Sequence, residues 1–131
     1  MIVPSIVTLL YVGVGGFIGS VLRYLIKIWV QGVGAAFPIG TLVVNIIGSF
    51  CLGFIVSMME YKEVLSEDTR LFLTVGLLGG FTTMSTFSYD SYRLLERKDL
   101  ALFFMNVGGT IILTLLAVFL GIKAGLIFFN K

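Results

Sequence analysis

Four long apolar stretches constrain the fold of this chain more than any other feature of its sequence. They cover about residues 5–30, 39–59, 71–95 and 100–128, and 58% of the 131 residues are hydrophobic. A helix needs roughly 20 apolar residues to cross a hydrocarbon core about 30 Å thick, and each stretch reaches that length. We therefore predict an all-α membrane protein with four transmembrane helices, folded as one integral-membrane domain over residues 1–131.

The third stretch contains a polar segment where lipid-facing residues are expected. Residues 79–88 (GGFTTMSTFS) hold two glycines and five hydroxyl side chains. Non-helical backbone survives at membrane depth only where protein or a water-filled cavity covers it. We predict that the third helix breaks near its middle, at Gly79-Gly80. The freed carbonyls of Gly79 and Thr82 would then offer oxygen-only ligands for a hard cation such as Na⁺.

Enzymatic chemistry has almost no reactive groups to use in this chain. There is no histidine, and the carboxylates lie in or beside the predicted loops. The exception is Asp90, which has Arg93 three residues further along, within helical pairing reach. No two carboxylates are placed for acid–base work, and no soft-metal ligand cluster exists. The inventory favours transport and indicates that the protein is not an enzyme.

The basic residues are almost evenly divided between the two ends of a four-helix bundle. The end with both termini would carry Lys62, Arg70, Lys123 and Lys131, and the other end Arg23, Lys27, Arg93, Arg97 and Lys98. Lys/Arg asymmetry normally sets membrane orientation. Near-equality favours insertion in both orientations and an antiparallel dimer, although a small local bias could also set one orientation.

Small residues recur at helical spacing and predict close packing of the helices. Gly15 and Gly19 form one small-xxx-small pair, and Gly121 and Gly125 form another. Packing within the chain is the simpler explanation of each pair. Sixteen glycines in so short a chain indicate a compact bundle that belongs to an oligomer.

Polar residues at spacing four form a stripe on two of the predicted helices. The second helix carries Thr41, Asn45 and Ser49, and the fourth carries Asn106, Thr110 and Thr114. Residues four apart share one helix face. On the fourth helix, uncharged donors in register suit a small dehydrated anion, and a hydrogen-bonded seam between helices is an equal alternative. On the second helix, the interhelical hydrogen bond is the favoured interpretation.

Three further side chains have both a functional and a plain interpretation. Phe87 lies three residues after Met84, so both point in roughly the same direction. A phenyl ring has a positive edge that can face an anion, although ordinary aromatic packing is the default. Arg23 could either snorkel to the interface or form an electropositive vestibule that concentrates anions.

Three motifs together resemble the Fluc fluoride channels, also called CrcB proteins. Residues 15–24 (GGFIGSVLRY) resemble the family's GGxxGxxxRY pattern. Residues 40–50 (GTLVVNIIGSF) resemble GTLxVNxxGSF, and residues 76–88 (GLLGGFTTMSTFS) resemble GxxGGxTTFSTFS. The match covers the first three helices in the right order, and the fourth helix matches loosely.

The resemblance implies a passive, selective F⁻ channel that lowers cytoplasmic fluoride. It implies an antiparallel homodimer with two pores, multi-pass in the lipid of the bacterial inner membrane, with no nucleic-acid partner. A central structural Na⁺ would be held by the backbone carbonyls of Gly79 and Thr82 from both subunits. The remaining roles would place Arg23 at a vestibule and Asn45, Met84, Ser85, Phe87, Asn106, Thr110 and Thr114 along the pore.

The sequence departs from the family pattern at Met84, where a phenylalanine is usual. A thioether lacks the positive ring edge, but it is flexible and can fill the same volume. Two other functions compete. A small dual-topology transporter of the multidrug type needs a carboxylate within the membrane, which this chain lacks at mid-depth. A non-transporting structural subunit would explain the glycines but not the hydroxyl cluster of residues 82–88.

Overall fold

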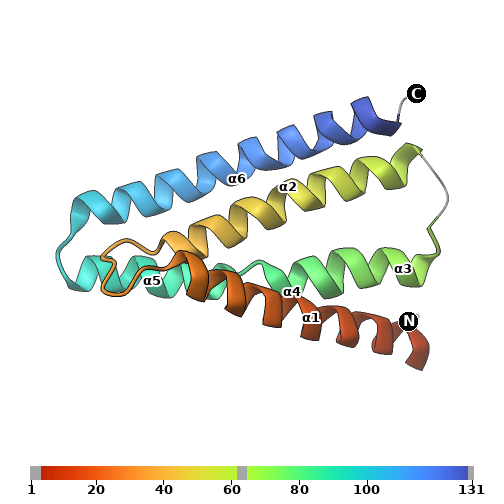
Figure 1. Cartoon of the computed structure of the whole chain (residues 1–131), viewed down its shortest axis with the longest axis horizontal. Coiled ribbons are helices and arrows are strands. Elements are labelled where there is room, and N and C mark those ends of the chain that lie inside the picture. Colours follow the sequence, from red (N-terminus) through yellow and green to blue (C-terminus); the bar gives the residue numbers. More distant parts are fainter. Residues whose placement is uncertain (1–3, 62–64, 130–131) are drawn as a thin grey trace.

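The computed structural model describes residues 4–61 and 65–129 as a bundle of four long helical spans (Figure 1). The spans over Ile6–Val30, Ile39–Glu60, Glu67–Glu96 and Leu100–Phe129 are each long and apolar enough to cross a membrane, as predicted. Both ends of the chain lie at one end of the bundle (Figure 1). Lys62 and Lys131, counted above in the charge balance, lie outside the described residues.

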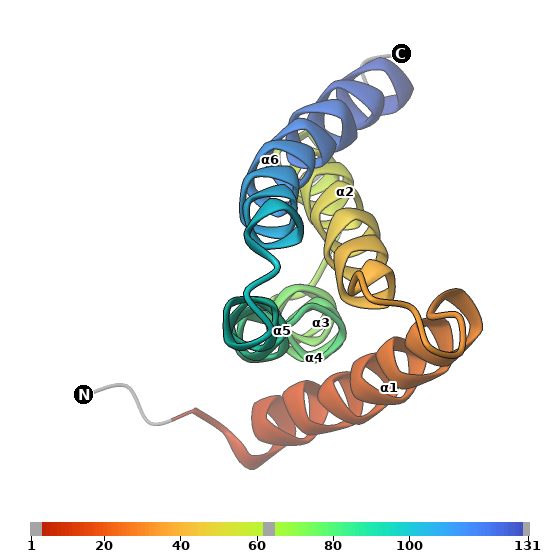
Figure 2. The same ribbon diagram turned by 90° about the vertical axis from the view of Figure 1, so that its left-hand side faces the viewer.

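Three spans are single elements or nearly so, and the third is composite. The elements are α1 (Ile6–Val30), α2 (Ile39–Tyr61), α3 (Glu67–Leu71), the π-helix η1 (Phe72–Leu78), α4 (Gly79–Phe81), α5 (Met84–Glu96) and α6 (Leu100–Phe129). Viewed along the bundle, α6 lies beside α2, and the broken third span lies between this pair and α1 (Figure 2).

The third span is broken, as predicted, but not at the predicted position. Gly79 and Gly80 are helical within α4, and the extended residues are Thr82 (φ −78°, ψ 159°) and Thr83 (φ −152°, ψ 116°). Gly80 is needed for close packing rather than for a break, because a Cβ there would lie 2.6 Å from the Gly16 carbonyl oxygen. The π-helix η1, which precedes α4 and the break, was also not predicted.

The glycine pairs bring helices together within the chain. A Cβ on Gly15 would lie 2.6 Å from the Phe72 carbonyl oxygen, and one on Gly19 would collide with the Leu77 carbonyl. Gly121 likewise packs on the backbone of Phe50 in α2. These contacts confirm the simpler explanation of the motifs, in which small residues let backbones approach closely.

Hydrogen bonds fix the two connections at the end of the bundle away from the termini, from a side chain in the first and from the backbone in the second. In the α1–α2 loop, the Gln31 amide donates to the Phe37 carbonyl at 3.0 Å and accepts from the Gly40 amide at 3.0 Å. In the α5–α6 turn, Lys98 has φ 61° and the Asp99 amide donates to the Leu94 carbonyl at 2.9 Å. This pattern is a Schellman-type C-cap with lysine at the position that usually holds glycine.

Most of the apolar surface of the spans faces outward. Only 11% to 33% of the most apolar part of each span is buried inside the subunit. Phe17 and Ile127, for example, are 71% and 74% exposed. Such a surface suits lipid or another apolar protein surface, because large exposed apolar faces mark interaction sites.

Candidate functional site: an uncharged groove at the helix break

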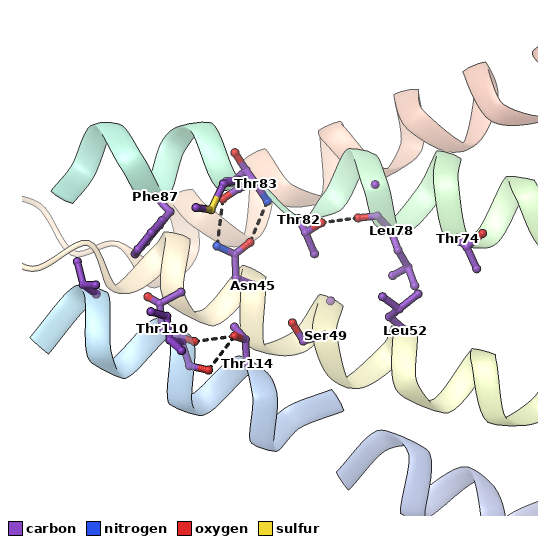
Figure 3. Close-up of a pocket in the computed structure, with 15 residues that line it drawn as sticks. Asn45, Ser49, Leu52, Thr74, Leu78, Thr82, Thr83, Phe87, Thr110 and Thr114 are labelled. Carbon is purple, nitrogen blue, oxygen red and sulfur yellow. Dashed lines mark hydrogen bonds between the residues drawn. The ribbon is translucent and has the colours of Figure 1, made fainter. Parts of the chain in front are cut away.

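A cavity of about 680 Å³ lies between α2, the broken third span and α6. Phe87 and Thr110 lie at one end of it, Leu52 and Leu78 lie toward the other, and Ser49 lies between them (Figure 3). We call this cavity the groove. Its lining residues are Asn45, Gly48, Ser49, Leu52, Thr74, Leu78, Gly79, Thr82, Thr83, Met84, Phe87, Val107, Thr110, Ile111 and Thr114. None of these side chains carries a charge.

The structure brings most of the predicted site residues together in the groove. The predicted residues that line it are Asn45, Gly79, Thr82, Met84, Phe87, Thr110 and Thr114. The other three, Arg23, Ser85 and Asn106, lie outside its lining. Ser85 is exposed on α5, and its hydroxyl lies 3.4 Å from the Thr83 hydroxyl.

A side-chain amide takes over the backbone hydrogen bonds of the helix break. The Thr83 amide donates to Asn45 Oδ1 at 2.8 Å, and Asn45 Nδ2 donates to the Thr83 carbonyl at 3.1 Å (Figure 3). Both residues are buried, with 8% of their surface exposed. Because unpaired backbone groups are costly away from water, this pair of bonds allows extended backbone to persist at mid-span. We call it the Asn45 clamp.

Thr83 also begins the second half of the span. Its hydroxyl oxygen accepts a hydrogen bond from the Thr86 amide at 3.2 Å, which makes Thr83 the N-cap of α5. Threonine is a favoured N-cap because its hydroxyl satisfies one of the free amides of the first turn. The residues that define the break are therefore Asn45, Thr83 and Thr86.

The same two interactions release two carbonyls from helical pairing. In a continuous helix the Gly79 carbonyl would accept from Thr83 and the Thr82 carbonyl from Thr86. Those amides donate instead to Asn45 Oδ1 and to Thr83 Oγ1. The Thr82 carbonyl lies 3.4 Å from Arg23 Nη1. The Arg23 guanidinium thus reaches the break itself.

The polar stripe on α6 faces α5 and the groove. Thr114 Oγ1 donates to the Thr110 carbonyl at 2.6 Å, as an isolated threonine on a helix commonly does. Asn106 is 1% exposed, and its Nδ2 donates to Ser91 Oγ on α5 at 3.0 Å. Asn106 therefore forms the interhelical seam that was one of the two interpretations of this stripe.

Thr110 differs from its neighbours on the stripe. Its Oγ1 is buried and has no hydrogen-bond partner among the described residues. A buried hydroxyl without a partner is costly, and few such groups occur in folded proteins. Thr110 lines the groove, so the wall of the groove contains an unused hydrogen-bonding group.

Met84 and Phe87 both line the groove, as their spacing predicted, but in different surroundings. Met84 is 72% exposed in the single subunit, whereas Phe87 is 9% exposed. The Phe87 ring extends from α5 toward α6 (Figure 3). The groove is therefore closed on the Phe87 side and open on the Met84 side.

Sequence reasoning missed Thr83 and the pairing of Thr41 with Asp90. The signal for Thr83 was weak, because threonine is a favoured N-cap residue but Thr86 stands where a capping box would have Glu or Gln. Thr41 Oγ1 donates to Asp90 Oδ2 at 2.6 Å and so connects α2 to α5. Asp90 is engaged there and does not line the groove, which gives no support to a carboxylate-driven transporter.

Comparison with known proteins identifies the family. The family model described as CrcB-like protein, Camphor Resistance (CrcB), matches residues 10–122. The fluoride-specific ion channel FluC 1 of Methanosarcina acetivorans is 54% identical over 114 residues, which are 87% of each chain. FluC 3 of Methanosarcina barkeri is 51% identical over 87% of this chain and 86% of its own. FluC of Rhizobium meliloti is 45% identical over 87% and 92%. With four membrane-length helices and this match, the chain is an integral, multi-pass membrane protein that belongs to the CrcB family.

Proposed function

We propose that this protein is a passive fluoride-selective channel rather than an enzyme, and that the groove forms part of its permeation path. The single observation that carries the proposal is the unpartnered, buried Thr110 hydroxyl in the wall of an uncharged, largely apolar groove. The relatives named above are fluoride-specific ion channels by name, which supports the same conclusion.

The groove offers a small anion hydrogen-bond donors without a fixed charge. The Thr110 hydroxyl has its proton free for a ligand. Asn45 Nδ2 has two N–H groups and uses one on the Thr83 carbonyl. Phe87 adds a ring whose positive edge can face an anion. Uncharged donors can replace the water shell of the anion without binding it so tightly that it stays. Passage requires this, because a permeant ion must also leave the site.

Four further residues complete the proposed path and its entrance. Ser85 lies next to Thr83 at the start of α5, and Asn106 positions Ser91 from α6. Thr114 lines the same groove, with its proton donated to the Thr110 carbonyl. Arg23 supplies positive charge close to the break, which attracts anions toward it. We therefore propose that Arg23 lies at the vestibule of the path.

We also propose that Na⁺ binds the carbonyls of Gly79 and Thr82 from two antiparallel subunits. Both carbonyls have lost their helical donors, and carbonyl oxygen is a suitable ligand for a hard cation. The Thr82 carbonyl accepts a long hydrogen bond from Arg23 at 3.4 Å, so Na⁺ would use its second lone pair. Gly79 is exposed on the groove, so a second subunit could approach it. A structural ion there would hold the two broken spans together, and the dimer would contain two pores.

The experiment is fluoride efflux from liposomes that contain the purified protein, with chloride as the comparison ion. A K⁺ ionophore clamps the voltage and a fluoride electrode reads release. We expect rapid F⁻ release without Cl⁻ leak, and strongly slowed release for Thr110→Val, which removes the free hydroxyl at similar volume.

Ser88→Ala provides a matched control, because Ser88 is an exposed α5 hydroxyl that donates to the Met84 carbonyl at 3.0 Å and does not line the groove. Its flux should equal that of the wild type. Absence of F⁻ release from a well-folded wild-type protein would refute the channel. Equal flux in Thr110→Val would remove the Thr110 hydroxyl from the path.

A further inference from the structure

A second cavity, of about 380 Å³, lies at the end of the bundle that carries the α1–α2 loop. Its polar lining consists of Lys27, Gln31, Tyr89, Asp90, Arg93 and Arg97. It shares no lining residue with the groove. We call it the basic pocket, and the fluoride path proposed above does not use it.

The lining of the basic pocket is strongly positive. Three cations face one carboxylate, Asp90, which leaves a formal charge of +2. Asp90 already accepts a hydrogen bond from Thr41 at 2.6 Å. Arg93 has a weak pairing with Glu96 at 3.8 Å, and both side chains are about half exposed. Among the described residues, the Lys27 and Arg97 side chains have no hydrogen bond or ion pair.

The basic pocket lies at the level where a bilayer presents its headgroups. Lys27 is in the last turn of α1, and Arg97 is the C-cap of α5. Trp29 is 77% exposed and Tyr92 is 59% exposed on the same two helix ends. Exposed tryptophan and tyrosine mark the interface between hydrocarbon and water.

The helix dipole explains only part of the positive charge that lines the basic pocket. Lys27 and Arg93 lie in the last turns of their helices, where cations offset the helix dipole. That account does not require the two to converge with Arg97 on one concave site. Nor does it require a loop held in place over that site by the two Gln31 hydrogen bonds. A preformed concave site costs less to bind than a flexible one.

We propose that the basic pocket binds the phosphate of an anionic phospholipid headgroup. Basic pockets between transmembrane helices at the interface are a known way of holding such lipids. The volume exceeds what one halide ion needs and accommodates a phosphate with its glycerol. A bound headgroup would fix the depth of this end of the bundle in the membrane.

The test compares lipids retained by the purified full-length protein. The protein is placed in nanodiscs of phosphatidylcholine mixed with phosphatidylglycerol, extracted in mild detergent, and the retained lipids are quantified by mass spectrometry. We expect enrichment of phosphatidylglycerol that falls with added salt. The variants Lys27→Gln and Arg97→Gln should each lower the enrichment about fivefold, the factor expected for one basic residue near the surface.

Lys98→Gln is the matched control, because it removes the same charge from the adjacent residue, which does not line the pocket. It should retain wild-type enrichment. An equal loss in Lys98→Gln would overturn the pocket in favour of a diffuse surface charge. Binding of inorganic phosphate to the detergent-solubilised protein, without enrichment of phosphatidylglycerol in nanodiscs, would assign the pocket to a free anion instead. Wild-type enrichment in the Lys27→Gln/Arg97→Gln double variant would refute it outright. Thermal melting of each variant checks that folding is unchanged.

Discussion

Replacement of Asn45 by leucine should destabilise the protein by about 2–3.5 kcal/mol. The change leaves two buried backbone groups of Thr83 without the partners that now lie at 2.8 and 3.1 Å. An orphaned buried group costs about 1–3 kcal/mol, which gives about 2–6 kcal/mol for two. Measured hydrogen bonds between membrane helices average about 0.6 and reach about 1.7 kcal/mol, which limits two bonds to about 3.5 kcal/mol. The expected loss of about 2–3.5 kcal/mol is the interval in which the cost of the orphaned groups and the limit for two interhelical hydrogen bonds overlap.

The assay is unfolding of the detergent-solubilised protein by titration with SDS, followed by circular dichroism. Ser49→Ala is the matched control, because Ser49 lies one turn further along the same face, also lines the groove, and makes no hydrogen bond among the described residues. Its effect should stay within about 0.5 kcal/mol. Asn45→Asp should also destabilise the protein, because it keeps an acceptor for the Thr83 amide but places a carboxylate oxygen against the Thr83 carbonyl in a buried site.

Equal stability of Asn45→Leu and Ser49→Ala would refute the reasoning, since it would mean that Thr83 finds its hydrogen bonds elsewhere. The most direct alternative partner for its amide is the Gly79 carbonyl, which would restore a continuous helix. Flux gives a second readout. Asn45→Asp should damage fluoride flux even if it folds well, because an ionised carboxylate on the groove repels an anion.

Three further changes test the packing and the groove. Phe87→Ile should abolish or sharply reduce fluoride flux while size-exclusion chromatography shows an unchanged assembly; normal flux would leave Phe87 as a packing residue. The wild type should conduct despite Met84, and Met84→Phe should conduct at a comparable rate, so flux seen only in Met84→Phe would contradict this. Gly19→Ala should lower stability in the SDS titration by about 1–3 kcal/mol, because the added Cβ collides with the Leu77 carbonyl. Gly13→Ala, with nothing within 4 Å of the added Cβ, should not.

The sequence was sufficient to predict the architecture because membrane spans follow from length and hydropathy alone. Four helices and a broken third span were predicted from spacing and composition, whereas the convergence of Asn45, Phe87 and Thr110 on one pore was implied only by the resemblance to the Fluc channels. The helical period determines which residues share a face, so the stripes on α2 and α6 could be identified before their partners were known.

The position of the break could not be predicted from local signals. Gly79-Gly80 is the stronger local breaker, yet both glycines stay helical because Gly80 is pressed against Gly16 of α1. The break occurs instead where Asn45, 38 residues away in sequence, supplies the lost hydrogen bonds. A long-range partner of this kind leaves no trace in a window of ten residues, and neither does the π-helical winding of η1.

The attachment of α5 has a consequence for the width of the groove. Three hydrogen-bonded contacts hold this half-helix to its neighbours: Asn45 with Thr83, Thr41 with Asp90, and Asn106 with Ser91. These contacts lie at the start and in the middle of α5, so they restrain both its position and its rotation about its own axis. A hydrogen bond has a nearly fixed length, whereas packed apolar side chains can change rotamer. The wall that α5 contributes to the groove should therefore move less against α2 and α6 than apolar packing alone would allow.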